Sequence, residues 1–205
     1  MFGQLAEVSK GGDFLPRIQL VTKGKYVDTG KIAPGRWGVP QPGGEDIVDL
    51  GATIDVVPFA ARPKALDVSD KNAIISNYDL NSPEFQRIKN APKNTGCMWG
   101  PSFLVLERNT GRLYELFFGN ASGRSEAGKL RPFLPNPNPS PATLSIRYKK
   151  TPDYGWHVPV VTKCSEPFSN GPSGPEILAA ISKFMTEEGG LEKVEEEAPK
   201  NKRAR

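Results

Sequence analysis

Hydrophobic positions along this chain recur mostly with the two-residue period that is typical of β-strands. The alternation over 15–21 predicts a strand, and we expect 26–32 to be its hairpin partner across Lys23-Gly24-Lys25. The strongest strand pattern covers 47–59, which is rich in β-branched and aromatic residues, and Gly51 indicates a bulge within it. Residues 62–66 extend or turn from there. Shorter strands are predicted over 73–76, 143–149 and 158–162.

The clearest hairpin of the chain joins two apolar runs at 103–108 and 112–118. The sequence Asn109-Thr110-Gly111 lies between them, and asparagine and glycine are the residues that tight reversals favour. These two segments are therefore expected to be neighbouring antiparallel strands.

Three helices are predicted between and after the strands. Over 82–89, Ser82 is a suitable N-cap and Pro83 suits the first helical position. A second short helix is expected over 122–130. The last, over 175–185, has helical apolar spacing and so should dock one face on the body, with Ile177, Leu178, Ile181, Phe184 and Met185.

Proline and glycine limit the regular structure of the chain. The 205 residues include 21 Gly and 20 Pro and are 37% hydrophobic, so loops are abundant, with 34–44 and 132–141 as the main candidates. Short strands with few helices favour a mainly β (α+β) fold. The expected form is an antiparallel OB-type barrel with inserted short helices and a C-terminal amphipathic helix.

Charge divides the chain into three parts. Residues 1–13 are expected to be a flexible leader and 14–186 a single β-rich OB-like domain with mildly basic character. Residues 187–197 carry six Glu and one Lys, a net charge of −5, and 198–205 carry four basic residues. Such a segment cannot bury enough apolar surface to order itself, so 187–205 is expected to be a disordered charged tail.

Cysteine and apolar content indicate a cytoplasmic protein. The spacing between Cys97 and Cys164 is not one that metal-binding cysteine motifs or small disulfide-rich scaffolds use, and this fits a reducing compartment. The N-terminus lacks a secretory pattern, and no apolar run is long enough to span a membrane. We therefore expect a cytoplasmic location, in the host cell if the protein is viral.

Motifs for catalysis, metals and cofactors are weak. His157 is the only histidine, so a catalytic triad would depend on it alone, and Cys and His residues are too few for a structural zinc site. The acidic pairs Asp46/Asp49 and Asp67/Asp70 leave open a hard cation such as Mg²⁺. The glycine-containing segment at 119–125 lacks the phosphate-loop pattern, although helix-start amides with Arg124 can hold one phosphate. The expectation is no catalytic residue, no metal and no cofactor.

All three tryptophans lie beside a glycine and near basic residues, in Arg36-Trp37-Gly38, Met98-Trp99-Gly100 and Gly155-Trp156-His157. A neighbouring glycine indicates a turn or bulge that presents the ring, and exposed rings among cations are what single-stranded nucleic acid requires. The alternative is that the rings are core residues and the cations ordinary surface charge. The candidate nucleic-acid-binding residues are Arg17, Arg36, Trp37, Arg62, Lys64, Trp99, Arg124, Tyr154 and Trp156.

Four short sequence segments resemble segments of a group of phage-encoded proteins. They are Leu15-Pro16-Arg17-Ile18-Gln19-Leu20, Arg62-Pro63-Lys64-Ala65-Leu66-Asp67, Gly96-Cys97-Met98-Trp99-Gly100-Pro101 and Trp156-His157-Val158-Pro159-Val160-Val161, within residues 14–168. Viral proteins of this size and tail character include OB-fold single-stranded DNA-binding proteins, so the resemblance implies that role. Such proteins usually end in an acidic tail that docks partners. The basic residues after Glu197 depart from that pattern.

The expected function is sequence-nonspecific, non-catalytic binding of single-stranded DNA, coating replication or recombination intermediates. Replication or recombination proteins are expected partners of the tail, and no membrane partner is expected. Two alternatives stay open. One is a viral structural or host-factor-binding interaction protein, because interfaces also favour Trp, Tyr and Arg. The other is a metal-dependent DNA-processing enzyme that uses the acidic pairs.

Overall fold

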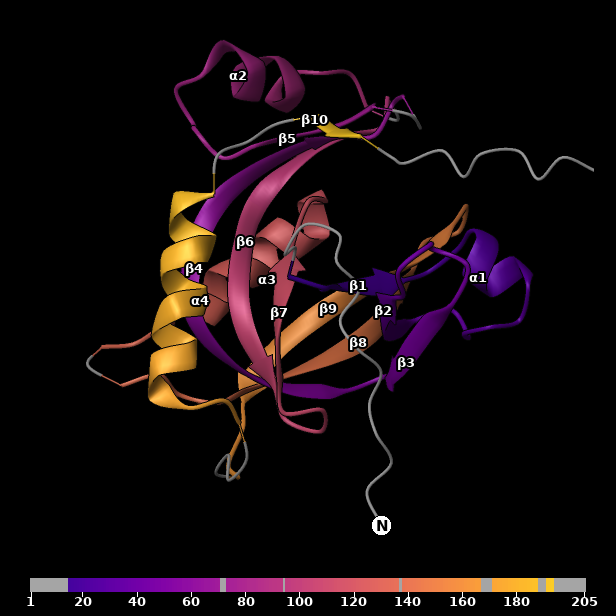
Figure 1. The fold of residues 1–205 in the computed structure, drawn as a ribbon. Coiled ribbons are helices and arrows are strands. Elements are labelled where there is room, and N and C mark those ends of the chain that lie inside the picture. Colours follow the sequence, from indigo (N-terminus) through magenta and orange to yellow (C-terminus); the bar gives the residue numbers. More distant parts are fainter. Residues whose placement is uncertain are drawn as a thin grey trace, which may run out of the picture.

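The fold is built mainly of β-strands that form one curled sheet with an open side (Figure 1). The computed structural model describes residues 15–70, 73–93, 95–136, 138–166, 171–187 and 191–193. The predicted leader therefore lies outside the described residues. Within them the sheet has ten strands in the order β10-β5-β4-β6-β7-β1-β2-β3, and the hairpin of β8 and β9 branches off β4. The mainly β class predicted from the sequence is confirmed, in the coarser form of a half-barrel.

The N-terminal part differs from its predicted hairpin. β1 (Arg17–Val21) is confirmed, but its antiparallel partner is β2 (Arg36–Pro40), which lies in the predicted loop at 34–44. The expected partner at 26–32 overlaps α1 (Lys25–Asp28), a single helical turn followed by Gly30 at φ 70°. Burial of Trp37 and Val39 in the core explains the difference, because tertiary packing outweighs loop-like composition.

The long strand pattern after residue 47 is two strands. β3 (Ile47–Gly51) pairs with β2, and β4 (Ile54–Asp67) includes the predicted extension over 62–66. The predicted bulge is confirmed, because the register passes from Trp37 opposite Gly51 to Gly38 opposite Asp49 and leaves Leu50 unpaired. Gly51 has a φ of 103°, which favours glycine at this reversal.

The centre of the sheet consists of β4, β6 (Cys97–Glu107) and β7 (Arg112–Phe117). The predicted hairpin of β6 and β7 is confirmed, and its turn is held by the buried Glu107 carboxylate, which accepts the N–H groups of Asn109 and Thr110 at 3.0 and 2.8 Å. β1 pairs with β7 in parallel. This one parallel contact attaches the N-terminal strands to the central hairpin.

The remaining strands extend the sheet from the edge of β4 that faces away from β6. β5 (Ala73–Asn77) pairs with its C-terminal part, and β8 (Ala142–Lys150) with its N-terminal part. β9 (Gly155–Lys163) pairs only with β8. β10 (Leu191–Lys193) pairs with β5 and falls within the predicted disordered tail, so the tail is not structureless at 191–193. Residues 188–190 and 194–205 lie outside the described residues.

The predicted helices are confirmed, but the docking face expected for the last one is narrower, because Leu178 and Met185 are exposed while Ile181 and Phe184 pack on the sheet. In α2 (Pro83–Lys89) the Ser82 hydroxyl accepts the Phe85 N–H at 3.1 Å. α3 (Ala121–Leu130) is followed by the short 3₁₀-helix η1 (Arg131–Phe133). α4 (Gly174–Thr186) begins after Ser173, whose N–H and hydroxyl both donate to the Glu176 carboxylate at 2.7 Å, a capping contact that the sequence reading missed.

The two faces of the central sheet are covered by different helices. The concave face packs on α3 through Ala127 and Leu130, and the outer face packs on α4 through Phe184. Figure 1 shows α4 in yellow outside β4 and β6, with α3 on the other side of them. No backbone ladder joins β2 or β3 to β8 or β9 among the described residues. The Trp37 indole N–H crosses this gap and donates to the Leu144 carbonyl at 3.2 Å.

Candidate nucleic-acid interface

The nine candidate residues fall into four separate places on the fold. Arg36 and Trp37 lie on β2, and Trp99 on β6 contacts Arg124 on α3. The outer face of the sheet carries Arg17, Arg62 and Lys64, of which Arg17 and Lys64 pair with Glu115 and Arg62 pairs with Glu187. Tyr154 and Trp156 lie at the end of the β8–β9 hairpin. The structure therefore brings together pairs and triples of these residues, but not one continuous surface.

Trp37 is a core residue and not a presented ring. Its exposed fraction is 2%, and its indole N–H donates to the Leu144 carbonyl. The interpretation of the neighbouring Gly38 as a sign of exposure is corrected: a Cβ at this position would lie 2.6 Å from Ile47 Cδ1, so the glycine allows close side-chain packing. Trp37 is unavailable for base stacking in this fold.

Arg62 and Lys64 are also buried, at 6% and 1% exposure. The Lys64 ammonium donates to both oxygens of Glu115 at 2.9 and 2.8 Å, and the Ser102 hydroxyl donates to the same carboxylate at 2.7 Å. Arg17 Nε adds a further bond at 3.1 Å from the half-exposed edge. The prediction that Arg62 and Lys64 form a surface grip on phosphates is therefore corrected.

The Glu115 carboxylate stays ionised in this buried cluster. Burial acts to raise its pKa, but the charges of Lys64 and Arg17 and the hydrogen bonds it accepts lower the pKa to about 2. The neighbouring Tyr78 has its pKa raised to about 12, chiefly by burial and then by the charge of Glu115. At neutral pH this cluster therefore consists of an ionised carboxylate, its cations and a neutral phenol.

Arg36 and Arg124 are each engaged within the protein. Arg36 Nε pairs with Asp49 at 2.6 Å across the β2–β3 ladder. Arg124 donates to the carbonyls of Trp99 and Gly119 at 2.9 Å, and burial lowers its pKa. Its guanidinium lies 4.2 Å from the centroid of the Trp99 ring, and Lys89 Nζ lies 5.3 Å from it. Arg124 thus joins α3 to β6, and Trp99 is half-buried between cations.

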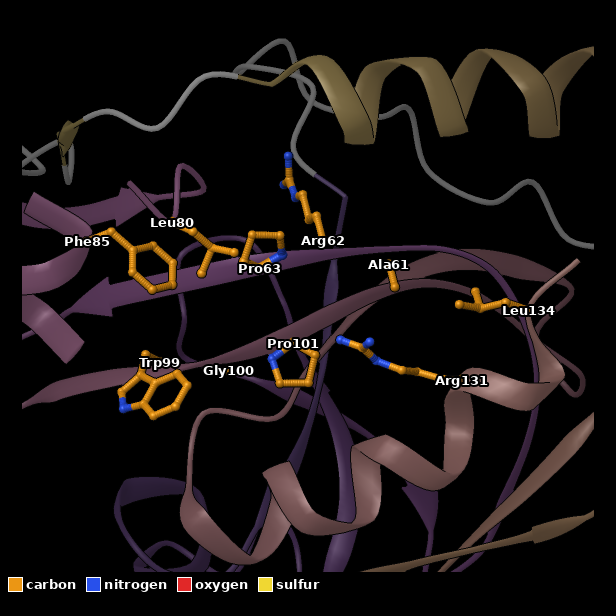
Figure 2. Close-up of a pocket in the computed structure, with 10 residues that line it drawn as sticks. All are labelled: Ala61, Arg62, Pro63, Leu80, Phe85, Trp99, Gly100, Pro101, Arg131 and Leu134. Carbon is orange, nitrogen blue, oxygen red and sulfur yellow. The ribbon is translucent and has the colours of Figure 1, made fainter. Parts of the chain in front are cut away.

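A pocket of about 390 Å³ lies beside Trp99, and this volume is within the range of small-molecule sites. Figure 2 shows Trp99, Phe85 and Leu80 at one end, Pro63 and Pro101 near the middle, and Arg131 and Leu134 at the other end. The Arg62 side chain extends away from Pro101 and Arg131 in this view. The pocket is therefore an apolar recess with one exposed cation, Arg131.

The end of the β8–β9 hairpin, residues 147–157, carries the most exposed aromatic side chains of the described residues. We call this segment the ribbon. Tyr154 is 65% exposed, and its ring centroid lies 5.2 Å from that of the half-buried Trp156. Tyr148, 57% exposed, lies opposite His157 with the ring centroids 5.0 Å apart. The rings form two pairs, one from each face of the two-stranded hairpin.

The ribbon also carries exposed cations. Arg147, Lys149 and Lys150 are all exposed, and none of them forms an ion pair with the described residues. Lys149 lies directly opposite Trp156 in the register, so a cation and a ring share one face. The nine residues predicted from the sequence to bind nucleic acid did not include Arg147, Tyr148, Lys149 and Lys150. Their signal was the alternation of basic and aromatic residues on both sides of the turn at 151–154.

The acidic pairs are occupied by cations of the protein. Asp46 pairs with Lys31 at 2.5 Å, Asp49 with Arg36 at 2.6 Å, and Asp67 with Arg87 at 2.7 Å. The pKa of Asp67 is lowered to about 2, first by its hydrogen bond with Ser69 and then by Arg87. Within the described residues, no group of three or more His, Cys, Asp or Glu side chains could hold a metal ion.

Comparison with protein-family models, with curated proteins and with solved structures finds no match to this chain. In the part of the chain that the structure describes, no helix is long and apolar enough to cross a membrane.

Proposed function

We propose that this protein is a phage-type single-stranded DNA-binding protein that coats replication or recombination intermediates in the host cytoplasm. It binds without sequence preference and catalyses no reaction. The observation that carries the proposal is the ribbon, where exposed aromatic rings and exposed, unpaired cations occur together in the described structure. This combination suits single-stranded nucleic acid, because bases stack on rings and cations neutralise the phosphates.

In this proposal the ribbon makes the main contact with DNA. Two bases stack on Tyr154 and Trp156, and Arg147, Lys149 and Lys150 neutralise the phosphates between and beside them. Stacking of this kind contributes about 1–3 kcal/mol per base. The phosphate contacts first expected at Arg36 and Arg124 are thereby moved to the ribbon, because those two guanidinium groups already have protein partners.

The pocket beside Trp99 supports a second contact with the same strand. Its apolar walls and its volume of about 390 Å³ suit one unstacked base, and the exposed Arg131 suits the phosphate next to it. Lys89 and Arg124 already lie against the Trp99 ring, so a base would pack against the pocket wall and not replace them.

We also propose that the half-barrel is an open form of the OB-type barrel. Support comes from the curl of β4 and β6, from the helix α3 on the concave face, and from the Trp37–Leu144 bond that spans the open side. OB-type barrels are themselves partly open and bind oligonucleotides on one face. Replication or recombination proteins remain the proposed partners of the tail, of which 188–190 and 194–205 are outside the described residues.

A protein-interaction role is the second candidate, and α4 is the observation in its favour. Leu178 and Met185, seven residues apart on α4, are 67% and 52% exposed. An exposed apolar pair on a helix is a common feature of protein contact surfaces. An enzymatic role has less support, because the acids that it would use are paired with Lys31, Arg36 and Arg87.

Binding of a fluorescent dT oligomer to the full chain tests the proposed function. Tyr154→Ala and Trp156→Ala should each weaken binding about 5- to 150-fold, which corresponds to about 1–3 kcal/mol of lost stacking. Leu178→Ala removes a similarly exposed apolar side chain on α4 and should bind like the wild type. Equal binding by all four proteins, or no binding by the wild type, would reject the ribbon as a DNA site.

A further inference from the structure

A small cavity on the outer face of the sheet contains a concentration of buried cations. Its volume is about 100 Å³, and it lies between the central strands and the end of α4. It is lined by Leu15, Arg17, Arg62, Lys64, Tyr78, Glu115, Phe184 and Glu187. Its two most exposed charged side chains, Arg17 and Glu187, are 32% and 27% exposed, so the cavity opens to solvent between them.

Cations exceed anions in the lining of this cavity. Three cations face the two carboxylates of Glu115 and Glu187. Glu115 is already engaged by Lys64, Arg17 and the Ser102 hydroxyl, so it has little capacity left for Arg62. Glu187, at the end of α4, is therefore the carboxylate that neutralises Arg62, with 2.5 Å between Nη2 and Oε2.

The Arg62 guanidinium is fixed in position but is not fully hydrogen-bonded. Its carbon lies 3.5 Å from the centroid of the Tyr78 ring and 4.2 Å from that of Phe184. Nη1 donates to the Phe184 carbonyl and Nη2 to Glu187, whereas the buried Nε has no partner among the described residues. A buried donor without an acceptor is costly, and a guanidinium is shaped to bind a second oxyanion.

We propose that this cavity binds a phosphate group, and that the Glu187 carboxylate occupies part of the phosphate position when the ligand is absent. Its volume exceeds the ~30 Å³ of one liquid water several-fold, yet is well below the volumes of small-molecule pockets. The ligand is thus a free phosphate ion or the terminal phosphate of an oligonucleotide. The site does not depend on the ribbon or on the proposed function.

Calorimetric titration of the full chain with inorganic phosphate, at constant ionic strength, tests the site. Glu187→Gln removes the competing carboxylate and should tighten phosphate binding about three- to fivefold, the effect of one partly exposed ion pair. Glu45→Gln is the matched control, because Glu45 is exposed and its side chain has no ion pair with the described residues. Phosphate binding that is absent from the wild type and from Glu187→Gln would overturn the proposal.

Arg62→Lys keeps the charge but loses the planar guanidinium, and should weaken phosphate binding about tenfold, as expected for one lost charge-assisted bond. If this buried variant does not fold, the comparison of Glu187→Gln with Glu45→Gln still decides the question. Equal phosphate affinity for folded Arg62→Lys and the wild type would count against the site.

Two dT oligomers, with and without a 5′-phosphate, distinguish the two sources of the ligand. Tighter binding of the phosphorylated oligomer, enhanced further in Glu187→Gln, identifies a DNA end. Equal binding of both oligomers, with free phosphate still bound, identifies the ion. If the wild type binds neither oligomer but does bind inorganic phosphate, the proposed function is rejected and the phosphate site is still supported.

Discussion

Burial separates the aromatic and basic side chains of this protein into structural and accessible ones. Trp37 and Trp156 have similar sequence surroundings, each with a glycine on one side, but Trp37 is 2% exposed and lies in the core. Trp156 is half-buried at the hairpin end and contacts the exposed Tyr154. The sequence around each ring was not sufficient to separate these cases, because a neighbouring glycine accompanies both the buried ring and the half-buried one.

Alanine substitution should distinguish the two tryptophans by stability. Trp37→Ala should lower the free energy of unfolding by about 3–5 kcal/mol, because it leaves a cavity and an unpaired Leu144 carbonyl. Trp156→Ala should change it by less than about 1.5 kcal/mol, since the ring is only half-buried. Urea denaturation measures both values. Equal losses for the two variants would show that Trp156 is also a core residue.

Glu115 should make stability depend on pH in the acid range. Its folded pKa of about 2 is below the ordinary value of 4.5, so its contribution is fully present above pH 4.5 and is lost as the pH falls toward 2. The loss amounts to about 3 kcal/mol for this shift of a buried group. Between pH 5 and pH 2 the free energy of unfolding should therefore fall by about 3 kcal/mol more in the wild type than in Glu115→Gln. Chemical denaturation at each pH measures this difference.

The same variant should be unstable at neutral pH. Glu115→Gln leaves the Lys64 ammonium buried without its carboxylate, so unfolding at pH 7 should become easier by about 3–5 kcal/mol. A variant as stable as the wild type at pH 7, with the same acid sensitivity, would show that the Lys64–Glu115 pair is not formed.

At the scale of elements, local patterns were sufficient for one hairpin and for the helices, but not for the hairpin expected over 15–32. The β6–β7 hairpin, α2 and α4 were predicted because their turn residues, caps and apolar spacing lie within a few residues of each other. β2 was missed because Pro34 and nearby glycines resemble a loop. Its strand character comes from pairing with β1 and β3, which local composition does not reveal.

The contact between β6 and the end of β7 should depend on a glycine. At Gly100 a Cβ would lie 2.0 Å from the Phe118 carbonyl oxygen, so Gly100→Ala should destabilise the fold by about 1–3 kcal/mol. Gly128→Ala is the control, because no atom lies within 4 Å of its Cβ position on α3, and it should stabilise by about 0.5–1 kcal/mol. Thermal unfolding of both variants measures the difference; a stabilising Gly100→Ala would contradict the close approach.

The ribbon as an element should account for part of the salt dependence of DNA binding. For single strands, the logarithm of affinity falls against the logarithm of salt by about 0.7 per neutralised phosphate. The double variant Lys149→Gln/Lys150→Gln should therefore reduce the slope by about 1.4 if both cations contact phosphates. Arg112→Gln, an exposed cation at the start of β7, should leave the slope unchanged. Equal slopes for all three proteins would exclude these lysines from the contact.

For the whole molecule, the class of fold followed from the sequence, but the position of the site did not. The curl of the sheet brings Arg17, Arg62 and Lys64 from two separate strands to one face. Arg62 and Lys64 are buried there and Arg17 is half-exposed beside them, so the predicted surface contacts became one cluster around the small cavity. Conversely, Arg147 and Tyr148 became part of the candidate site only through the β8–β9 register. Both changes depend on distant pairings, which a local pattern cannot specify.

Mapping of crosslinks shows whether the ribbon binds single-stranded DNA. The full chain is irradiated with a dT oligomer, and the crosslinked residues are identified by mass spectrometry. We expect crosslinks at Tyr148, Tyr154, Trp156 or His157, and their loss when unlabelled oligomer competes. Crosslinks confined to other surfaces, or none under conditions in which the oligomer is bound, would contradict the claim.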